Sequence, residues 1–446
     1  MKVRFSVLFL LSLAAWAQTP LTLADAVRTA LDKHPSLEAA SARLKAAETR
    51  IEQARGSYLP KVNYTETFAR SDNPVFVFSS LLTQHQFSEK NFAIGPLNRP
   101  DFMNNFQSVI SVDQVLYDAG QIRHGVQAAE LGHKIAGEDE RAARMGVIAG
   151  VLRTYFGAVL AREGLHVANE AVKSAETDLK RADTVRAAGM ATDADVLSIR
   201  VHVAAMKEQQ IRRTYDLAVA RAALNEALGL PLDTGHDLTT KLDLVALKGL
   251  GIAEYEKTAA AERPEARQVD LSTKLAENQT RTARSALLPQ AGVRAMFEAD
   301  RRQFVNQGGV NWLFAASLKW NLFNGFSDRA KISEAAESLR GARAVQRQTD
   351  AGIRLQVRQA YAGLKAAEER IEVASAAVTM AEESLRITKN RYEAGLATVS
   401  DLLRNETALL ETQTRRLAAV YDQRVAAAML ELAAGTLAVD SESVRS

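Results

Sequence analysis

The fold is decided by residues 391–403, which read RYEAGLATVSDLL. The stretch combines the end of one helix with the start of another. Gly395 suits the left-handed conformation that closes a helix. Thr398, followed three residues later by Asp401, has the pattern of an N-cap whose carboxylate supports the first turn. Because only a short link fits between Gly395 and Thr398, we expect two helices that fold back on each other in antiparallel directions.

The same turn occurs earlier in the chain. Gly189, Thr192 and Asp195 repeat the pattern 206 residues before its second occurrence. Ahead of it, a helical stretch bordered by Pro35 and Pro60 recurs 229 residues later with a proline at both borders. The chain of 446 residues is therefore two copies of one unit.

After each second proline, the spacing of the apolar residues changes from helical to alternating. Residues 290–300 and 311–323 alternate clearly between apolar and polar side chains, and residues 62–68 and 106–117 do so less regularly. The pattern predicts four strands of about ten residues, in two hairpins. One apolar face fits a membrane barrel, although the same alternation also occurs in the core of a soluble sandwich.

The two tryptophans of the last strand favour the membrane. Trp312 and Trp320 share the apolar face and lie eight residues apart, roughly 26 Å along a strand. The apolar band between the aromatic girdles of membrane barrels is about 25 Å tall. We therefore assign both tryptophans to the membrane girdle.

Each copy continues into a long helix, the turn and a returning helix. No proline interrupts residues 101–230 or 290–446. Each long helix, of roughly 95 Å, carries a heptad seam with small residues that permit close helix packing. The long helices are expected at 123–186 and 329–391, the strand hairpins at 61–117 and 290–323, and the turns at 187–192 and 392–398.

The domain organisation follows from these borders. The predicted segments are a signal peptide at 1–17, a first repeat at 18–230, an inter-repeat segment at 231–262, a second repeat at 263–435 and a tail at 436–446. Each repeat consists of a short helix, the strand hairpin, the long helix, the turn and the returning helix. The first hairpin has the longer loop, at 72–105, whose role as a plug or as a variable surface loop stays open.

The ends and the composition narrow the class of protein. Lys2 and Arg4, an apolar run and the small residues Ala15 and Ala17 form the pattern of a secretory signal. The absence of Cys excludes disulfides and thiolate sites. No later apolar run reaches about eighteen residues without interruption, so we expect no transmembrane helix. The net charge of +3 without a polybasic patch argues against nucleic acid as a partner.

Four strands cannot close a barrel, and an open sheet edge is not tolerated in lipid. The smallest membrane barrels need about eight strands. Two subunits would supply eight strands with a filled interior, whereas three would supply twelve and leave a lumen. The chain must therefore oligomerise, and its helices would then pack side by side into a second, helical barrel.

On these residues the chain resembles the TolC-like outer-membrane efflux proteins. The resemblance rests on the duplication, on Leu-Pro before each first strand, on LYDAG at 116–120 and LFNG at 322–325, and on the two turns. It implies a mixed α+β membrane protein that forms a homotrimer. Each subunit would contribute four strands to a shared twelve-stranded transmembrane β-barrel, and long antiparallel helices to a periplasmic α-barrel.

The resemblance also implies a function. The protein would lie in the outer membrane of a Gram-negative-type bacterium, in contact with its lipid, and extend into the periplasm. It would passively conduct substrates delivered by an inner-membrane transporter, of RND or ABC type, and a periplasmic membrane-fusion adaptor, as in tripartite efflux or type I secretion. Drug, metal ion and protein substrates are not distinguished by the sequence.

In that family the turns form the periplasmic tip that meets the adaptor. The positions that match are Gly189, Thr192, Asp195, Arg391, Gly395, Thr398 and Asp401. The first copy departs from the pattern, since Val185 stands where the family has Arg. All of these residues would also be explained by helix capping alone.

The resemblance further implies an aperture lined by acidic rings, for which Asp195 and Asp401 are the candidates. A further acidic residue is common three places after Asp401, but Arg404 stands there. We expect either an aperture that is less selective for cations, or a pairing of Arg404 with Asp195 or Asp401.

Nothing in the sequence predicts an enzyme. The seven His are scattered, and no two of them stand four residues apart with a Glu between them, as the H-E-x-x-H motif of a helical zinc site requires. A phosphate-binding loop and a nucleophile elbow are also missing from the sequence. We therefore expect no catalytic site, cofactor or metal. The alternative function is a periplasmic coiled-coil adaptor or scaffold, which shares the signal and the heptads but needs no lipid-facing strands.

Overall fold

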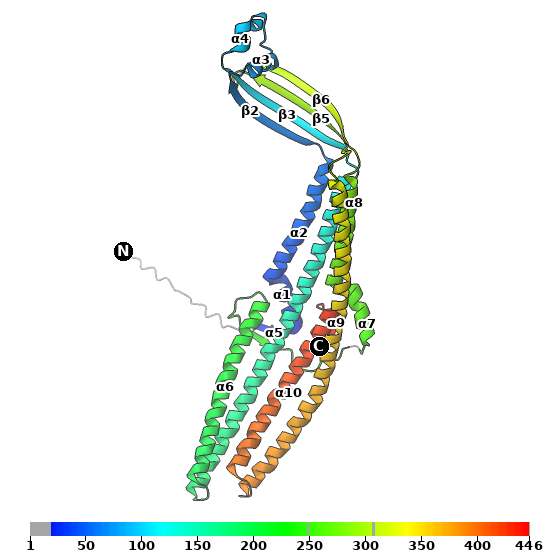
Figure 1. Ribbon diagram of the computed structural model, residues 1–446. Coiled ribbons are helices and arrows are strands. Elements are labelled where there is room, and N and C mark those ends of the chain that lie inside the picture. Colours follow the sequence, from blue (N-terminus) through cyan, green and yellow to red (C-terminus); the bar gives the residue numbers. More distant parts are fainter. Residues whose placement is uncertain (1–18, 248, 306–307, 446) are drawn as a thin grey trace, which may run out of the picture. The chain divides into compact units, whose positions relative to one another are not determined.

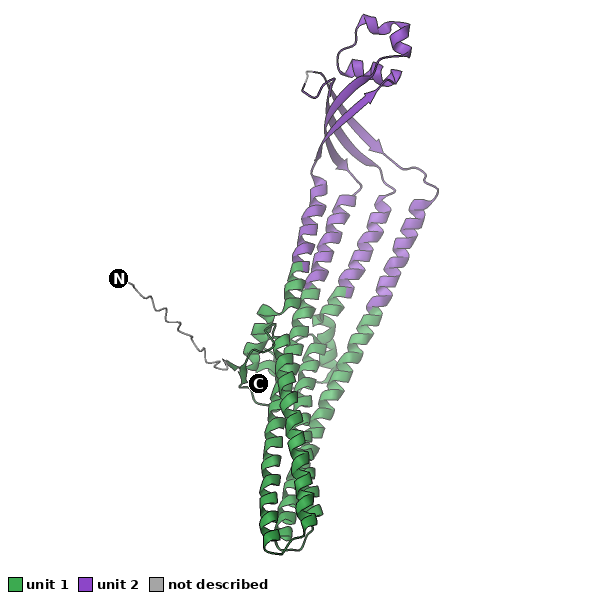
Figure 2. Ribbon diagram, turned by 90° about the vertical axis from the view of Figure 1, so that its left-hand side faces the viewer, with its two compact units in different colours: residues 1–42, 138–268, 347–446 green, residues 43–137, 269–346 purple. Residues whose placement is uncertain are grey.

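The computed structural model describes residues 19–247, 249–305 and 308–445, so the predicted signal peptide at 1–17 lies outside the described residues. The chain forms two compact units, each built from separate segments of both repeats (Figure 2). Unit 1 comprises residues 1–42, 138–268 and 347–446, and unit 2 comprises residues 43–137 and 269–346.

Four antiparallel strands form the sheet of unit 2, in the order β2-β3-β5-β6 (Figure 1). The strands are β2 (Lys61–Ser71), β3 (Met103–Tyr117), β5 (Gln290–Arg301) and β6 (Gly309–Lys319). Because β3 pairs with β5, the hairpins of the two repeats join into one sheet, and β2 and β6 are its edges. The expected alternation up to residue 323 is too long, since β6 ends at Lys319 and Trp320 follows the strand.

The register places apolar side chains on one face across all four strands. One row of cross-strand partners consists of Tyr64, Ile110, Phe297 and Trp312. The next row on the opposite face consists of Thr65, Val109, Glu298 and Asn311. Cross-strand partners share a face, so we call the face of Trp312 the apolar face and that of Asn311 the polar face. Trp312 is 79% exposed on this sheet, so the apolar face lies uncovered.

The loop between β2 and β3 is folded rather than irregular. It contains the helices α3 (Pro74–Thr83), η2 (Glu89–Phe92) and α4 (Ile94–Asn98). Asn73 caps α3 by accepting hydrogen bonds from the backbone N–H groups of Val75 and Phe76, and Pro74 occupies the first helical position. These helices gather at the end of the sheet where β2 leads into β3 (Figure 1).

The remaining elements are mainly helical. The long helices α5 (Gln121–Ala187) and α9 (Ser327–Glu393) have 67 residues each, and they return as α6 (Asp193–Ala227) and α10 (Val399–Ala434). Both long helices begin two residues before the expected positions. The shorter helices are α1 (Leu23–Lys33), α2 (Pro35–Arg55), η1 (Gly56–Tyr58), α7 (Ile252–Glu262), α8 (Pro264–Ser285) and α11 (Glu442–Arg445). A small parallel sheet pairs β1 (Thr19–Leu21) with β4 (His236–Leu238).

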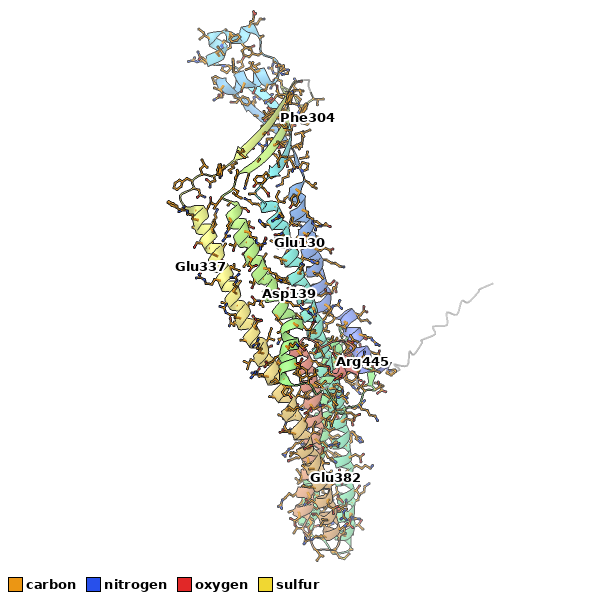
Figure 3. All side chains as sticks on the ribbon, turned by 90° about the vertical axis from the view of Figure 1, so that its right-hand side faces the viewer. Glu130, Asp139, Phe304, Glu337, Glu382 and Arg445 are labelled. Carbon is orange, nitrogen blue, oxygen red and sulfur yellow. The ribbon has the colours of Figure 1, made fainter. Side chains whose placement is uncertain are left out.

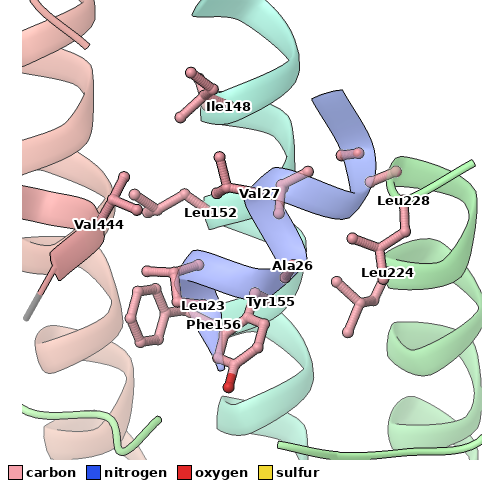
Figure 4. Close-up of a cluster of buried hydrophobic side chains, with 14 of the residues drawn as sticks. Leu23, Ala26, Val27, Ile148, Leu152, Tyr155, Phe156, Leu224, Leu228 and Val444 are labelled. Atoms are coloured by element: carbon pink, nitrogen blue, oxygen red, sulfur yellow. The ribbon is translucent and has the colours of Figure 1, made fainter. Parts of the chain in front are cut away.

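The main core of unit 1 gathers around the middle of α5. Leu152, Tyr155 and Phe156 are almost fully buried against α1, α6 and α11 (Figure 4). The Tyr155 hydroxyl donates to the carbonyl of Leu21 at 2.8 Å and accepts from the backbone N–H of Thr240 at 3.0 Å. The inter-repeat segment is thereby fixed to the start of the described chain.

Among the described residues, α5 is long and apolar enough to cross a membrane by length and composition, although no transmembrane helix was expected because polar residues interrupt its apolar runs. Half of its most apolar window is buried within the structure. The buried side chains include Val151, Leu152, Tyr155 and Phe156 of the core cluster. Core packing therefore accounts for the apolar composition of this helix.

A glycine at the end of α10 gives a test of the packing within unit 1. Gly435 has φ 77°, and a Cβ on it would lie 2.8 Å from the Cα of Arg263. Gly435→Ala should cost about 1–3 kcal/mol of stability, since backbone strain adds to the overlap. The measurement is thermal unfolding followed by circular dichroism in detergent. Gly395→Ala is the control, because Gly395 has φ 71° with no atom within 4 Å, and equal shifts of the two midpoints would contradict the assignment.

Candidate functional site

The two turns have the same capping geometry. The Thr398 hydroxyl accepts from the backbone N–H of Asp401 at 3.2 Å, and the Asp401 carboxylate accepts from the backbone N–H of Thr398 at 3.2 Å. Thr192 and Asp195 make the equivalent bonds at 3.2 and 3.1 Å. Both helix starts are therefore reciprocal capping boxes, as the spacing predicts.

Both turns also close the preceding helices through left-handed glycines. Gly189 has φ 75° and Gly395 has φ 71°. Arg391 donates to the carbonyl of Leu396 at 3.4 Å, which adds a side-chain contact across the second turn. These residues build two exposed helical hairpins, α5–α6 and α9–α10.

Arg404 pairs with Asp401 within the same turn of α10, at 3.6 Å. Asp195 and Asp401 were the two expected partners of Arg404, and the structure shows the pair with Asp401. Hydrogen bonds from the hydroxyl and the backbone N–H of Thr398 lower the pKa of Asp401, and the charges of Arg404 and Arg391 add to this effect. Asp401 therefore stays ionised at neutral pH, and Arg404 lies close enough to offset its charge.

A buried polar cluster joins the two hairpins above the turns, and we call it the four-helix junction. Its members are Ser174 and Asp178 of α5, His202 of α6, Lys389 of α9 and Glu406 of α10. His202 Nε2 lies 3.0 Å from a carboxylate oxygen of Glu406, and Lys389 Nζ lies 3.0 Å from Asp178. The Ser174 hydroxyl donates to Glu406 at 3.2 Å. All four helices of unit 1 that form the hairpins thus contribute to one network.

The junction holds its charges away from water. The side chains of Asp178, Glu406 and His202 are only 4%, 8% and 9% exposed. Burial, together with a hydrogen bond to Glu406, raises the pKa of Asp178, and Lys389 opposes this shift. Burial alone would also raise the pKa of Glu406, but hydrogen bonds with His202 and Asp178 outweigh it and leave that pKa lowered. The two carboxyls therefore differ, with Glu406 the more acidic of the pair.

A cavity of about 260 Å³ lies beside the junction and is lined by Glu170, Ser174, His202 and Glu406, among others. Around it, apolar residues of α5 and α6 pack with Val399 and with half-buried Tyr392 and Leu403. An ion pair between Arg181 and Glu393 links α5 and α9 closer to the turns. The junction cannot be predicted from the sequence, because its members come from distant positions.

The two tryptophans assigned to the girdle lie at different kinds of position. Trp312 belongs to β6 and points from the apolar face. Trp320 lies just after β6, is 57% exposed, and its ring N–H donates to the carbonyl of Leu287 at 3.1 Å. A ring that is exposed while its polar end is held is typical of interfacial aromatic residues. In Figure 3, Phe304 marks the other end of the sheet, in the short loop between β5 and β6.

Comparison with known proteins identifies the family. Protein CyaE of Bordetella pertussis is 24% identical over 421 residues, which cover 94% of this chain and 84% of that protein. The alkaline protease secretion protein AprF of Pseudomonas aeruginosa is 25% identical over 431 residues, covering 94% and 85%. The CmeC outer membrane channel of Campylobacter jejuni has the same fold, with a TM-score of 0.78 at 18% identity, covering 94% of this chain and 87% of that one.

The family model described as outer membrane efflux protein matches residues 26–230 and 257–436, which include both repeats. The match spans the capped hairpins and the four strands alike. The chain therefore belongs to the outer membrane efflux protein family.

Proposed function

We propose that this outer-membrane channel works as a homotrimer in which three subunits share one twelve-stranded barrel, and that it is the exit duct of a tripartite efflux or type I secretion system. Substrates delivered by an inner-membrane transporter, of RND or ABC type, and a periplasmic membrane-fusion adaptor would pass through it without a catalytic step. The observation that carries this proposal is a four-stranded sheet with two free edges and one uncovered apolar face.

The sheet supports closure by copies of itself. In lipid, every backbone hydrogen-bonding group must find a partner, so the edges β2 and β6 require another subunit. Three copies give twelve strands and a lumen. The polar face, with Glu298 and the ion pair of Arg294 with Asp113 at 2.5 Å, would then line the lumen, while the apolar face meets lipid. Trp312 and Trp320 would lie in the girdles.

The hairpins support contact with an adaptor at the periplasmic tip. The residues that we assign to this contact are Gly189, Thr192, Asp195, Arg391, Gly395, Thr398 and Asp401. We assign Asp195, Asp401 and Arg404 to the aperture between the three subunits. The repeats at 18–230 and 263–435, with the segment 231–262 between them, are the units that we propose to have duplicated. AprF is named as an alkaline protease secretion protein, which supports the secretion system among the two kinds of exporting system proposed here.

The test combines assembly with conduction. The purified protein should have the mass of a trimer in detergent, migrate differently on a gel with and without heating, and produce discrete currents in a planar bilayer. Crosslinking in membranes before purification should recover the adaptor and the transporter. A monomer that remains in solution without detergent and carries no current would refute the proposal. The alternative function, a periplasmic coiled-coil adaptor or scaffold, would then be favoured.

Arg404 gives a test of the aperture. Arg404→Asp should increase the ratio of potassium to chloride permeability, because a ring of three positive charges becomes a ring of three negative ones. The measurement is the reversal potential of single channels under a KCl gradient. Arg415→Asp is the matched control on the same helix, since Arg415 is 74% and Arg404 77% exposed. An equal shift in both variants would place Arg404 outside the aperture.

A further inference from the structure

The helix α3 lies on the polar face of the sheet. The carbonyl of Thr83, at its C-terminal end, accepts from the side chain of Asn311 at 3.2 Å. A Cβ on Gly309 would lie 1.9 Å from the same carbonyl oxygen. Gly309 and Asn311 are both polar-face positions of β6, so glycine is needed at 309 to let the helix end approach the strand.

A buried hydrogen-bond chain fixes the end of α3 to the same face. Gln84 donates to the side chain of Asn105 at 2.8 Å and to the carbonyl of Asn104 at 3.0 Å. Asn105 in turn donates to Asp300 at 2.5 Å. Gln84, Asn105 and Asp300 are 2%, 7% and 0% exposed. The chain of contacts runs from the loop over β3 to β5, and we call it the Gln84 tether.

The helix crosses the sheet rather than following one strand. It follows β2 in the sequence and contacts β3, β5 and β6. Its ten residues span about 15 Å, and three gaps between neighbouring strands span about 14 Å. One α3 therefore covers the full width of the wall that one subunit contributes.

One side of α3 is buried and the opposite side is exposed. Val77 and Ser80 are 8% and 4% exposed, whereas Val75 and Leu82, on the opposite side of the helix, are 77% and 47% exposed. An apolar stripe on the polar face has no partner within the described subunit. A second copy related by the axis of the barrel would present the same stripe to it.

The dimensions decide how much of the lumen remains. Twelve strands that are about 4.8 Å apart and tilted by about 40° enclose roughly 24 Å between opposite backbones. A helix with its side chains is about 10 Å thick. Three such helices, which together line the inner wall, would leave a central gap of about 4 Å, which is too narrow for a drug or an unfolded protein.

We propose that α3 is an outer gate: three copies, held by the Gln84 tether, close the mouth of the barrel and meet through Val75 and Leu82. This rests on the trimeric barrel proposed above. The loop that carries α3 lies at the end of the sheet opposite to Lys61 and Tyr117, where the strands connect to the helices α2 and α5. With those helices in the periplasm, the gate faces the outside of the cell, and export requires α3 to leave the wall.

The test uses the absence of cysteine from the chain. Ser111→Cys places a thiol on the polar face of β3, roughly 20 Å deeper than Asn105. Val305→Cys places one in the β5–β6 loop, where Val305 is 92% exposed. Intact cells are treated with a thiol reagent that does not cross membranes. Val305→Cys should react rapidly and Ser111→Cys slowly, whatever the state of the periplasmic aperture.

Removal of the tether should open the gate. Adding Gln84→Ala to Ser111→Cys should raise the rate of modification by roughly tenfold, the effect of losing a buried hydrogen bond on an equilibrium. Asn311→Ala, which frees the carbonyl of Thr83, should act in the same direction without altering the tether. The trimer band on an unheated gel shows that each variant is assembled.

The outcomes separate the gate from the barrel. No reaction at Val305→Cys, or no trimer, would overturn the proposed function itself. Rapid reaction at Ser111→Cys with the tether intact would overturn the gate while leaving the barrel in place. Slow reaction at Ser111→Cys combined with either Gln84→Ala or Asn311→Ala would also overturn it, since the contacts proposed to hold α3 would then not control access.

Discussion

Ala316→Arg should prevent most of the protein from reaching the folded trimer, whereas Ser317→Arg should leave assembly nearly unchanged. Ala316 lies on the apolar face of β6, four residues from Trp312 and four from Trp320, so it marks the middle of the apolar band. An arginine at the middle of a bilayer costs about 2–4 kcal/mol on the lipid face of a barrel. A trimer would bear this cost three times.

The neighbouring position makes this test specific to the face. Ser317 is paired with Gly292 on the polar face, and both Ala316 and Ser317 are exposed on the sheet of one subunit. The folded fraction is measured on an unheated gel after urea titration of protein in lipid vesicles. If both arginines had the same effect, the assignment of the apolar face to lipid would be wrong.

The faces of β5 and β6 could be predicted because alternation is a local pattern. The alternation in the strands of the first repeat is less regular, and the structure explains why. Glu66 and Ser108 stand on the apolar face, where Arg301 donates to Glu66 at 2.8 Å and also binds Ser108. Glu66 and Arg301 are 235 residues apart, so their mutual neutralisation cannot be seen in the sequence. Each residue alone appears only as a break in the alternation.

The capped turns were predictable for the same reason, since Thr398 and Asp401 are close in sequence. The four-helix junction was not. Its origin lies in a departure from the duplication: Asp183 and Arg200 of the first repeat occupy the positions of Lys389 and Glu406 of the second. Asp183 and Arg200 pair with each other at 3.5 Å. Lys389 and Glu406 instead bind residues of the first repeat. Their charges, which are reversed relative to Asp183 and Arg200, therefore connect the two hairpins.

The loop at 72–105 shows a third limit of the sequence. Asn73 before Pro74 is a local signal for the start of α3. The position of that helix, however, depends on Gly309 and Asn311 more than two hundred residues later. Composition alone therefore favoured a variable surface loop and left a plug as the alternative.

Lys389→Glu should open the junction and destabilise the hairpins, and the effect should grow as the pH rises. The ammonium of Lys389 is the charge that opposes the raised pKa of Asp178. Replacing it with a carboxylate places a third acid beside Asp178 and Glu406. Two like charges about 4 Å apart repel by about 4 kcal/mol in partly buried surroundings. Because Lys389 is 34% exposed, we expect solvent to reduce the loss to about 3 kcal/mol per subunit.

The direction of the pH dependence follows from Asp178. Its pKa in the folded protein is already raised, and burial is the largest cause. The added carboxylate of the variant should raise this pKa further. A carboxyl with a raised folded pKa contributes most stability below its unfolded pKa, and this is lost as the pH rises through the folded value. The variant should therefore come close to the parent protein in acid and fall furthest behind it at pH 8.

Two variants on the same helix separate this mechanism from a general effect of charge. Lys389→Arg keeps the cation beside Asp178 and should behave as the parent protein. Arg386→Glu reverses a charge that is 62% exposed and that pairs with Glu383 on the same helix, so it should change neither stability nor its pH dependence appreciably. Thermal unfolding between pH 5 and pH 8 measures both quantities.

Channel currents then connect the junction to function. The junction is where α5 and α6 are bound to α9 and α10 through buried charge, so repulsion there should separate the hairpins next to the proposed aperture. In a planar bilayer, the mean conductance of Lys389→Glu should rise with pH, while that of Arg386→Glu stays constant. A variant that loses stability at pH 8 without any gain in conductance would show that the junction only holds the subunit together. A gain in conductance that disappears in acid would identify it as the contact that keeps the hairpins closed.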